Sequence, residues 1–155
     1  MNTTENLFRI LDENGIDYKK LEHEPAKTSE EAAKIRGTDL HTGVKALLLK
    51  TTEKKFIMVL VPDDKKVDLE KIAGLEKTKK VSLASQSEVL EETKCEIGGV
   101  PPFGFTKDEK DNRIKTYMDK EILSVETVNF NAGNKTVSVS MKGEDLGKVV
   151  YYIGF

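Results

Sequence analysis

The sequence predicts an α+β protein in which a mixed β-sheet is flanked by helices, and three observations lead to this fold class. Apolar runs of strand length alternate along the chain with segments in which apolar residues recur at helical spacing. Cap signals based on serine or threonine precede several helical segments, and glycines follow them. No linker, repeat or low-complexity stretch interrupts this alternation, so we expect residues 1–155 to form a single domain.

The first half of the chain predicts two helices, a strand and a hairpin. Residues 3–14 place leucine and isoleucine at helical spacing and end before a glycine, which predicts an amphipathic helix, and residues 16–21 predict a short strand. Residues 28–36 open with Thr-Ser-Glu-Glu, a capping-box sequence that predicts a second helix. The apolar runs 44–49 and 56–61 are separated by a polar hexapeptide, a pattern typical of a β-hairpin.

The second half continues the alternation of helix and strand. Residues 68–73 predict a short helix that ends near a glycine, and residues 81–84 predict a strand. Residues 85–92 open with Ser-Gln-Ser-Glu, a second capping-box sequence, and predict another helix. The remaining predicted elements are strands at residues 114–118, 123–130 and 137–141 and a helix at residues 144–150.

Composition narrows the classes of function. The apolar runs are far shorter than the roughly 20 residues of a membrane span, and the first residues lack a signal-peptide pattern, so we expect a cytoplasmic protein without a membrane partner. One cysteine cannot form an internal disulfide, and two histidines cannot supply a three-histidine metal site, so we expect neither a metal nor a cofactor. The formal net charge of −2 argues against a broad nucleic-acid-binding surface, but a small basic patch can still bind one end of a nucleic acid.

Lys45 is the first candidate for chemistry because it lies within an apolar strand. In an extended chain it shares one face with Leu47 and Leu49, while Val44 and Ala46 lie on the other face. If both faces are covered, the ammonium group is partly desolvated and can hold a carbonyl or phosphate oxygen. The alternative is a strand-end lysine whose charge reaches the solvent.

A loop rich in glycine and proline is the second candidate. Its residues are Gly98, Gly99, Val100, Pro101, Pro102, Phe103 and Gly104. Glycines let backbone N–H groups approach a ligand without interference from a Cβ, so the loop can orient a small acyl group. A rigid turn that covers the core is the alternative. The Asn-Ala-Gly-Asn sequence at 131–134 predicts a hairpin turn.

Four segments, taken in order, resemble the YbaK and prolyl-tRNA synthetase editing-domain family. They are residues 23–28 (His-Glu-Pro-Ala-Lys-Thr), 44–47 (Val-Lys-Ala-Leu), 98–104 and 131–133 (Asn-Ala-Gly). Each motif is modest alone, but together they span nearly the whole chain. The resemblance implies a mixed, barrel-like sheet flanked by helices. It also implies a pocket that accepts the aminoacyl end of mischarged tRNA and hydrolyses the ester in trans.

The resemblance also implies roles for particular residues. Lys45 matches the lysine that positions the tRNA end and is the expected catalytic residue, and residues 98–104 match the loop that shapes the acyl pocket. Further implied substrate-binding positions are His23, Thr28, Ala46, Asn131, Ala132, Gly133 and Ser138. A lysine ammonium is a poor general base at neutral pH, so we expect Lys45 to anchor substrate oxygens. The neighbouring ribose hydroxyl would then assist the attack of water.

The expected partner is the acceptor end of mischarged tRNA, chiefly tRNA-Pro carrying a small wrong amino acid such as cysteine or alanine, with prolyl-tRNA synthetase as a second candidate partner. Four positions, however, depart from the cysteine-specific branch of the family: Leu21, Glu30, Ala46 and Ser138 replace a tyrosine, a phenylalanine, a threonine and an aspartate. These departures leave the removed amino acid open. They also motivate a rival hypothesis, a non-catalytic module that binds aminoacyl-tRNA or a synthetase. A pocket for a small metabolite is the third hypothesis.

Overall fold

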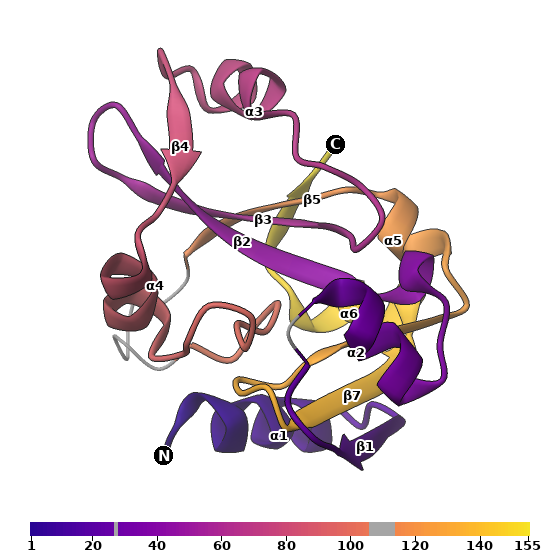
Figure 1. Ribbon diagram of the computed structural model, residues 1–155. Helices are drawn as coiled ribbons and strands as arrows, with labels where there is room; N and C mark the ends of the chain where they lie inside the picture. The colour runs from indigo at the N-terminus through magenta and orange to yellow at the C-terminus, as the bar shows by residue number, and fades with distance from the viewer. Residues whose placement is uncertain (27, 106–113) are drawn as a thin grey trace.

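The structure is a computed structural model that describes residues 1–26, 28–105 and 114–155; Lys27, within one of the segments that carry the resemblance, lies outside the described residues. Among the described residues the strands form two sheets, ordered β1-β7-β6 and β4-β2-β3-β5-β8 (Figure 1). The strands are β1 (Tyr18–Glu22), β2 (Val44–Thr51), β3 (Phe56–Pro62), β4 (Val81–Leu83), β5 (Lys115–Met118), β6 (Thr127–Asn131), β7 (Val137–Lys142) and β8 (Tyr152–Gly154). The helices are α1 (Thr3–Glu13), α2 (Ser29–Arg36), the 3₁₀ helix η1 (Leu40–Thr42), α3 (Leu69–Glu76), α4 (Gln86–Thr93), α5 (Glu121–Ser124) and α6 (Gly143–Val149).

The predicted α+β class with a mixed sheet is confirmed. In the five-stranded sheet, β2 pairs antiparallel with β3 and β4, whereas β3 with β5 and β5 with β8 are parallel pairs. The three-stranded sheet is antiparallel throughout. A single bridge between Gly43 and Asn129 links the two sheets, so within the described residues they do not close into one barrel. The barrel-like closure that the resemblance implied is therefore corrected to two bridged sheets.

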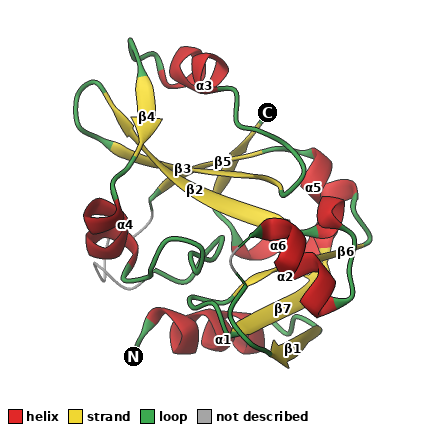
Figure 2. Ribbon diagram, viewed as in Figure 1, coloured by secondary structure: helices red, strands yellow, loops and turns green. Residues whose placement is uncertain are grey.

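Two apolar clusters hold the layers together. The larger cluster joins α1, through Leu7 and Leu11, to residues of both sheets such as Met58 and Phe130. The smaller cluster packs α3 on the opposite face of the five-stranded sheet, through Ile72. Figure 2 shows the corresponding arrangement, with α1 beside the three-stranded sheet and α3 beside the five-stranded one. Burial of these large side chains removes apolar surface from water and is the main stabilising contribution.

Cap residues define where the helices begin. The Asn2 side chain, rather than a threonine, caps α1 by accepting from the Glu5 N–H. Thr28 caps α2, and at α4 both halves of the predicted capping box between Ser85 and Glu88 are present. These local bonds satisfy N–H groups that the first helical turn leaves without partners.

The predicted strand at residues 123–130 is wrong in its first half, where the chain forms α5 before β6 begins. The carboxylate of Asp119 accepts a 3.0 Å hydrogen bond from the Glu121 N–H, and the Ser124 hydroxyl donates to the Glu121 carbonyl at 2.7 Å. Such side-chain to backbone bonds favour a turn over an extended chain. The three-residue edge strand β8 was not predicted. No helix in the described parts of the chain has the length and apolar character needed to cross a membrane.

Candidate active site

A cavity of about 320 Å³ opens where β2 meets α2, α4 and the end of β6. Most of its lining is apolar, and the charged side chains are Arg36, Lys45 and Asp63. A mostly apolar cavity with a few convergent polar groups is the usual form of a small-molecule site. The lining residues are Ala26, Thr28, Ala32, Arg36, Val44, Lys45, Ala46, Leu47, Leu48, Asp63, Leu83, Ala84, Val89, Ile97, Gly98, Val100 and Asn131.

Lys45 lies in β2, opposite Val61 of β3, and is half-buried. Within the described residues its ammonium forms no hydrogen bond and no ion pair. Its positive charge nevertheless acts on the Asp63 carboxyl. Burial raises the pKa of that carboxyl, and the charge of Lys45 partly opposes the effect of burial. Lys45 therefore presents an unpaired cation to the cavity, which suits it to hold an oxygen of a ligand.

Asp63 follows Pro62, the last residue of β3, and is half-buried in the same cavity. Its backbone N–H donates a 2.8 Å hydrogen bond to the Gly43 carbonyl. Burial raises the pKa of the Asp63 carboxyl to about 6, although the positive charges of Arg36 and Lys45 act in the opposite direction. The cavity thus holds one carboxylate together with two cations.

Arg36, at the end of α2, directs all three guanidinium nitrogens at oxygens of the three-stranded sheet. Nε donates to the Ser138 hydroxyl at 2.9 Å, and the two terminal nitrogens donate to the side-chain oxygens of Asn129 and Asn131, each at 2.7 Å. Burial lowers the pKa of Arg36, while the charge of Asp63 raises it. Through these three hydrogen bonds, Arg36 holds α2 against β6 and β7.

The same network reaches the glycine-rich loop and His23. Asn131 donates from its amide to the carbonyl of Gly98, which fixes the start of the loop. On the other side, His23 Nε2 lies 2.6 Å from the Ser138 hydroxyl, and its Nδ1 lies 2.8 Å from the Glu24 carbonyl. Since a carbonyl can only accept, Nδ1 carries a proton, and Nε2 shares a hydrogen bond with the Ser138 hydroxyl. His23 therefore supports the network from outside the cavity lining.

The predicted loop divides between lining and support. Gly98 and Val100 line the cavity, whereas the residues outside this lining are Gly99, Pro101, Pro102, Phe103 and Gly104. The Gly104 carbonyl accepts a 3.0 Å hydrogen bond from the Asn6 amide, and the Phe103 ring meets the Phe130 ring edge to face. The second half of the loop is thus anchored on α1 and the core, which positions its first half.

The other sequence-predicted positions are similarly divided. Ala46, Thr28 and Asn131 line the cavity. Ala132 is fully buried in the larger apolar cluster, and Gly133, at φ +99°, leaves no room for a Cβ beside Thr4. These last two residues shape the turn that follows Asn131.

The four departures from the cysteine-specific branch occupy different environments. Ala46 lines the cavity, and Ser138 is buried behind it as the bridge between Arg36 and His23. Leu21 and Glu30 are exposed and lie outside the lining. Only Ala46 therefore contributes directly to the shape of the cavity wall.

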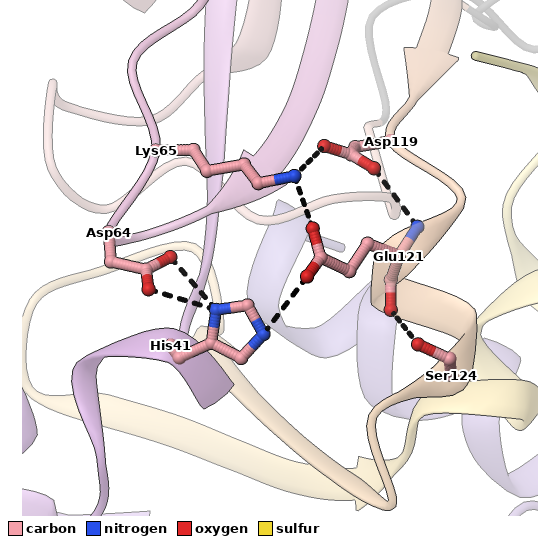
Figure 3. Close-up of polar contacts among 6 residues, drawn as sticks. All are labelled: His41, Asp64, Lys65, Asp119, Glu121 and Ser124. Carbon is pink, nitrogen blue, oxygen red and sulfur yellow. Dashed lines mark hydrogen bonds and ion pairs between the residues drawn. The ribbon is translucent and has the colours of Figure 1, made fainter.

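A second group of polar residues lies at the surface near η1 and α5 (Figure 3). Nδ1 of His41 lies 2.9 Å from the Asp64 carboxylate, and its Nε2 lies 3.5 Å from Glu121. Lys65 contacts Glu121 and, at 3.1 Å, Asp119. None of these five side chains lines the described cavity. Asp119 is thus a turn and surface-pairing residue.

Sequence reasoning did not identify Arg36 or Asp63 as site residues. A basic residue in the last turn of a helix is ordinarily explained by the helix dipole, and Pro-Asp-Asp after a strand is ordinarily a turn. The one available signal for Asp63 was its position directly after β3, the partner of the strand that carries Lys45. Cys95 is buried, as expected of a lone thiol, and no group of metal-ligating residues occurs among the described residues.

Comparisons with known proteins identify the family of this chain. Residues 23–149 match the model of the aminoacyl-tRNA editing domain family, so the chain belongs to this family. The "Multifunctional Ser/Thr-tRNA deacylase ProXp-y" of Escherichia coli K12 is 31% identical over 147 residues, which are 92% of this chain and 85% of that protein. The "Prolyl-tRNA editing protein ProX" of Acetoanaerobium sticklandii is 29% identical over 97% of this chain and 92% of that protein. The family membership predicted from four short segments is confirmed.

Solved structures share the fold. The crystal structure of hypothetical protein APE2540 superposes with a TM-score of 0.82 at 24% identity, over 95% of this chain and 97% of that one. A protein described as a candidate trans-editing enzyme for prolyl tRNA synthetase gives a TM-score of 0.78 at 23% identity, over 99% and 96% of the two chains. A proline–tRNA ligase of Bacillus cereus G9842 matches 74% of this chain with only 19% of its own length, at 31% identity.

Proposed function

We propose that this protein is an aminoacyl-tRNA deacylase that acts in trans, hydrolysing the ester between tRNA and a small, wrongly attached amino acid. The observation that carries the proposal is the unpaired Lys45 ammonium in a small, mostly apolar cavity of a chain that belongs to the editing-domain family. Residues 1–155 would act as one domain in the cytoplasm, where tRNA is charged and used. The relatives named as a Ser/Thr-tRNA deacylase and a prolyl-tRNA editing protein support this class of substrate.

Lys45 provides positioning and charge in this mechanism rather than proton abstraction. Its ammonium holds an oxygen of the terminal aminoacyl-adenosine and stabilises negative charge as the ester carbonyl becomes tetrahedral. Water attacks the carbonyl carbon, and the neighbouring ribose hydroxyl relays a proton from that water to the departing ribose oxygen. The acyl–oxygen bond then breaks, and the products are the free amino acid and uncharged tRNA.

The cavity supports a small acyl group. Ala26, Ala32 and Ala46 keep its walls short, and the Gly98 backbone, held by Asn131, approaches without a side chain. An acyl group of the size of alanine, serine, cysteine or threonine suits a cavity of about 320 Å³ that must also admit part of the terminal ribose. The tRNA would be tRNA-Pro, with prolyl-tRNA synthetase as a candidate partner.

A substrate panel tests the proposal. tRNA-Pro is charged separately with alanine, serine, cysteine, threonine and proline, and release of free amino acid is measured with the protein alone and with prolyl-tRNA synthetase added. We expect hydrolysis of at least one small non-cognate ester and protection of prolyl-tRNA. Binding of these tRNAs without hydrolysis, by a folded protein, would contradict the proposal and favour the non-catalytic module.

A further inference from the structure

The Asp63 carboxylate occupies the space that a side chain at position 43 would fill. It follows β3, and its backbone is bonded to Gly43 at the start of β2. A Cβ added to Gly43 would lie 2.1 Å from Asp63 Oδ2, well inside any tolerable contact. The backbone of Gly43 is at φ −75° and ψ 143°, which any residue can adopt. A side chain at position 43 would therefore have to displace the Asp63 carboxylate, although the backbone conformation would accept it.

The Asp63 carboxylate is also without a partner. Within the described residues it forms no hydrogen bond and no ion pair, and it is the only acidic side chain of the cavity lining. Arg36, whose positive charge lowers the pKa of Asp63 against the effect of burial, donates its described hydrogen bonds to Asn129, Asn131 and Ser138 instead. Half-buried charges that serve structure alone are ordinarily paired. An unpaired carboxylate in a cavity is a group that a cationic ligand can satisfy.

The ligand of the proposed deacylase carries such a cation. An aminoacyl ester has its α-ammonium group on the carbon next to the ester carbonyl. An anion on the protein can therefore bind the ammonium group while a cation beside it binds an ester or ribose oxygen. Lys45 in β2 and Asp63, directly after β3, both line the cavity and supply that pair. Resting on the proposed function, we infer that Asp63 binds the α-ammonium group of the aminoacyl moiety while Lys45 holds an oxygen. Asp63 thereby selects free aminoacyl esters over esters that lack the amine.

The test compares esters that differ only at the α-position. Alanyl- and seryl-tRNA are assayed beside lactyl- and glyceryl-tRNA, in which a hydroxyl replaces the amine. We expect wild type to prefer the amine-bearing member of each pair by about ten- to hundredfold in kcat/KM, the range of one charge-assisted hydrogen bond. Asp63→Asn should lose this preference because kcat/KM falls for the aminoacyl esters alone. Its kcat/KM for the hydroxyacyl esters should stay within about threefold of the wild-type value.

Two further variants sharpen the result. Gly43→Ala should mimic Asp63→Asn, because the new methyl group displaces the carboxylate without altering residue 63. Asp64→Asn is the matched control: it removes the neighbouring carboxylate, which pairs with His41 outside the cavity lining, and should leave the preference unchanged.

Several outcomes would overturn the inference. Equal slowing of aminoacyl and hydroxyacyl esters by Asp63→Asn would make Asp63 a general base or a structural residue instead. A wild-type protein without preference for the amine would overturn it as well, while leaving the deacylase function standing. Absence of hydrolysis of these four esters, and of cysteinyl- and threonyl-tRNA as well, by wild type would remove the proposed function itself.

Discussion

Arg36 at the end of α2 donates a 2.7 Å hydrogen bond to the side-chain oxygen of Asn131 in β6, and Asn131 in turn donates to the carbonyl of Gly98. This chain of contacts connects three segments that lie far apart in the sequence and that all line the same cavity. The position of the glycine-rich loop beside Lys45 therefore depends on a residue that the sequence alone does not identify.

Replacement of Arg36 should destabilise the protein far more than replacement of its exposed helix neighbour Lys34. Arg36→Met leaves Asn129 and Ser138, both buried, without their donor, and an unsatisfied buried polar group costs about 1 to 3 kcal/mol. We expect a loss of about 2 to 4 kcal/mol in the free energy of unfolding, measured by urea denaturation. Lys34→Met on the same helix should change it by less than about 0.5 kcal/mol. Equal effects of the two variants would contradict the network.

Asp63→Asn should stabilise the fold at neutral pH. Burial raises the folded-state pKa of Asp63 to about 6, above the ordinary aspartate value of 3.8, so the folded state binds the proton more tightly than the unfolded state. The ionised side chain therefore destabilises the fold. This destabilisation is absent below about pH 4 and reaches its full size above about pH 6. Arg36 and Lys45 reduce this cost, while Asp64 and Glu30 add to it.

The size of that gain follows from the pKa. One pKa unit corresponds to about 1.4 kcal/mol, so we expect Asp63→Asn to add about 1 to 3 kcal/mol at pH 7.5. Thermal unfolding of both proteins between pH 3.5 and pH 8 measures the difference. A gain that persists at pH 3.5, or a loss at pH 7.5, would show that the buried charge is not the cause.

Two glycine substitutions should have opposite effects. Gly104→Ala forces a side chain into φ +102° and brings its Cβ within 3.0 to 3.3 Å of Leu7 in α1, so we expect a loss of about 2 kcal/mol or more in the free energy of unfolding. Gly74→Ala lies inside α3 with nothing within 4 Å of the new Cβ and should add about 0.5 to 1 kcal/mol. Chemical denaturation of both variants checks the pair. A neutral Gly104→Ala would contradict the described loop path.

His41 and Asp64 form a hydrogen bond of the kind found in catalytic dyads (Figure 3). Both residues, however, lie outside the cavity lining. We therefore expect His41→Ala to retain kcat/KM for deacylation within about threefold, measured on the best tRNA of the substrate panel. A fall of more than about thirtyfold in a folded variant would move the reaction to this surface network.

The elements that the sequence predicted well are those with strong local signals. The caps at Thr28 and Ser85, the hairpin of β2 and β3, and the glycine that ends α2 each act over a few residues. The prediction failed in the first half of residues 123–130 because a short segment with two apolar residues suits a buried helical turn as well as a strand. There, the hydrogen bond from the Glu121 N–H to the Asp119 side chain favours α5.

The site was predictable only where a motif marked it. Lys45 and the glycine-rich loop are recognisable by their sequence context. Asp63 and Arg36 are not recognisable in this way, because they enter the site through tertiary contacts. Asp63 occupies the space beside Gly43, and Arg36 donates hydrogen bonds to side-chain oxygens of β6 and β7. Residues such as Phe103 and Gly104 lie in the right motif but support the site from α1 and the core.

The proposed deacylation depends on the Lys45 ammonium, and the single-turnover rate of amino acid release from mischarged tRNA-Pro by Lys45→Ala and Lys50→Ala tests this dependence. Lys50 lies on the same strand but pairs with Glu88 at 2.7 Å, away from the cavity lining. We expect Lys45→Ala to fall by about a hundredfold or more, the usual loss when one preorganised donor is removed, and Lys50→Ala to stay near wild type. Retained release by a folded Lys45→Ala would contradict the account.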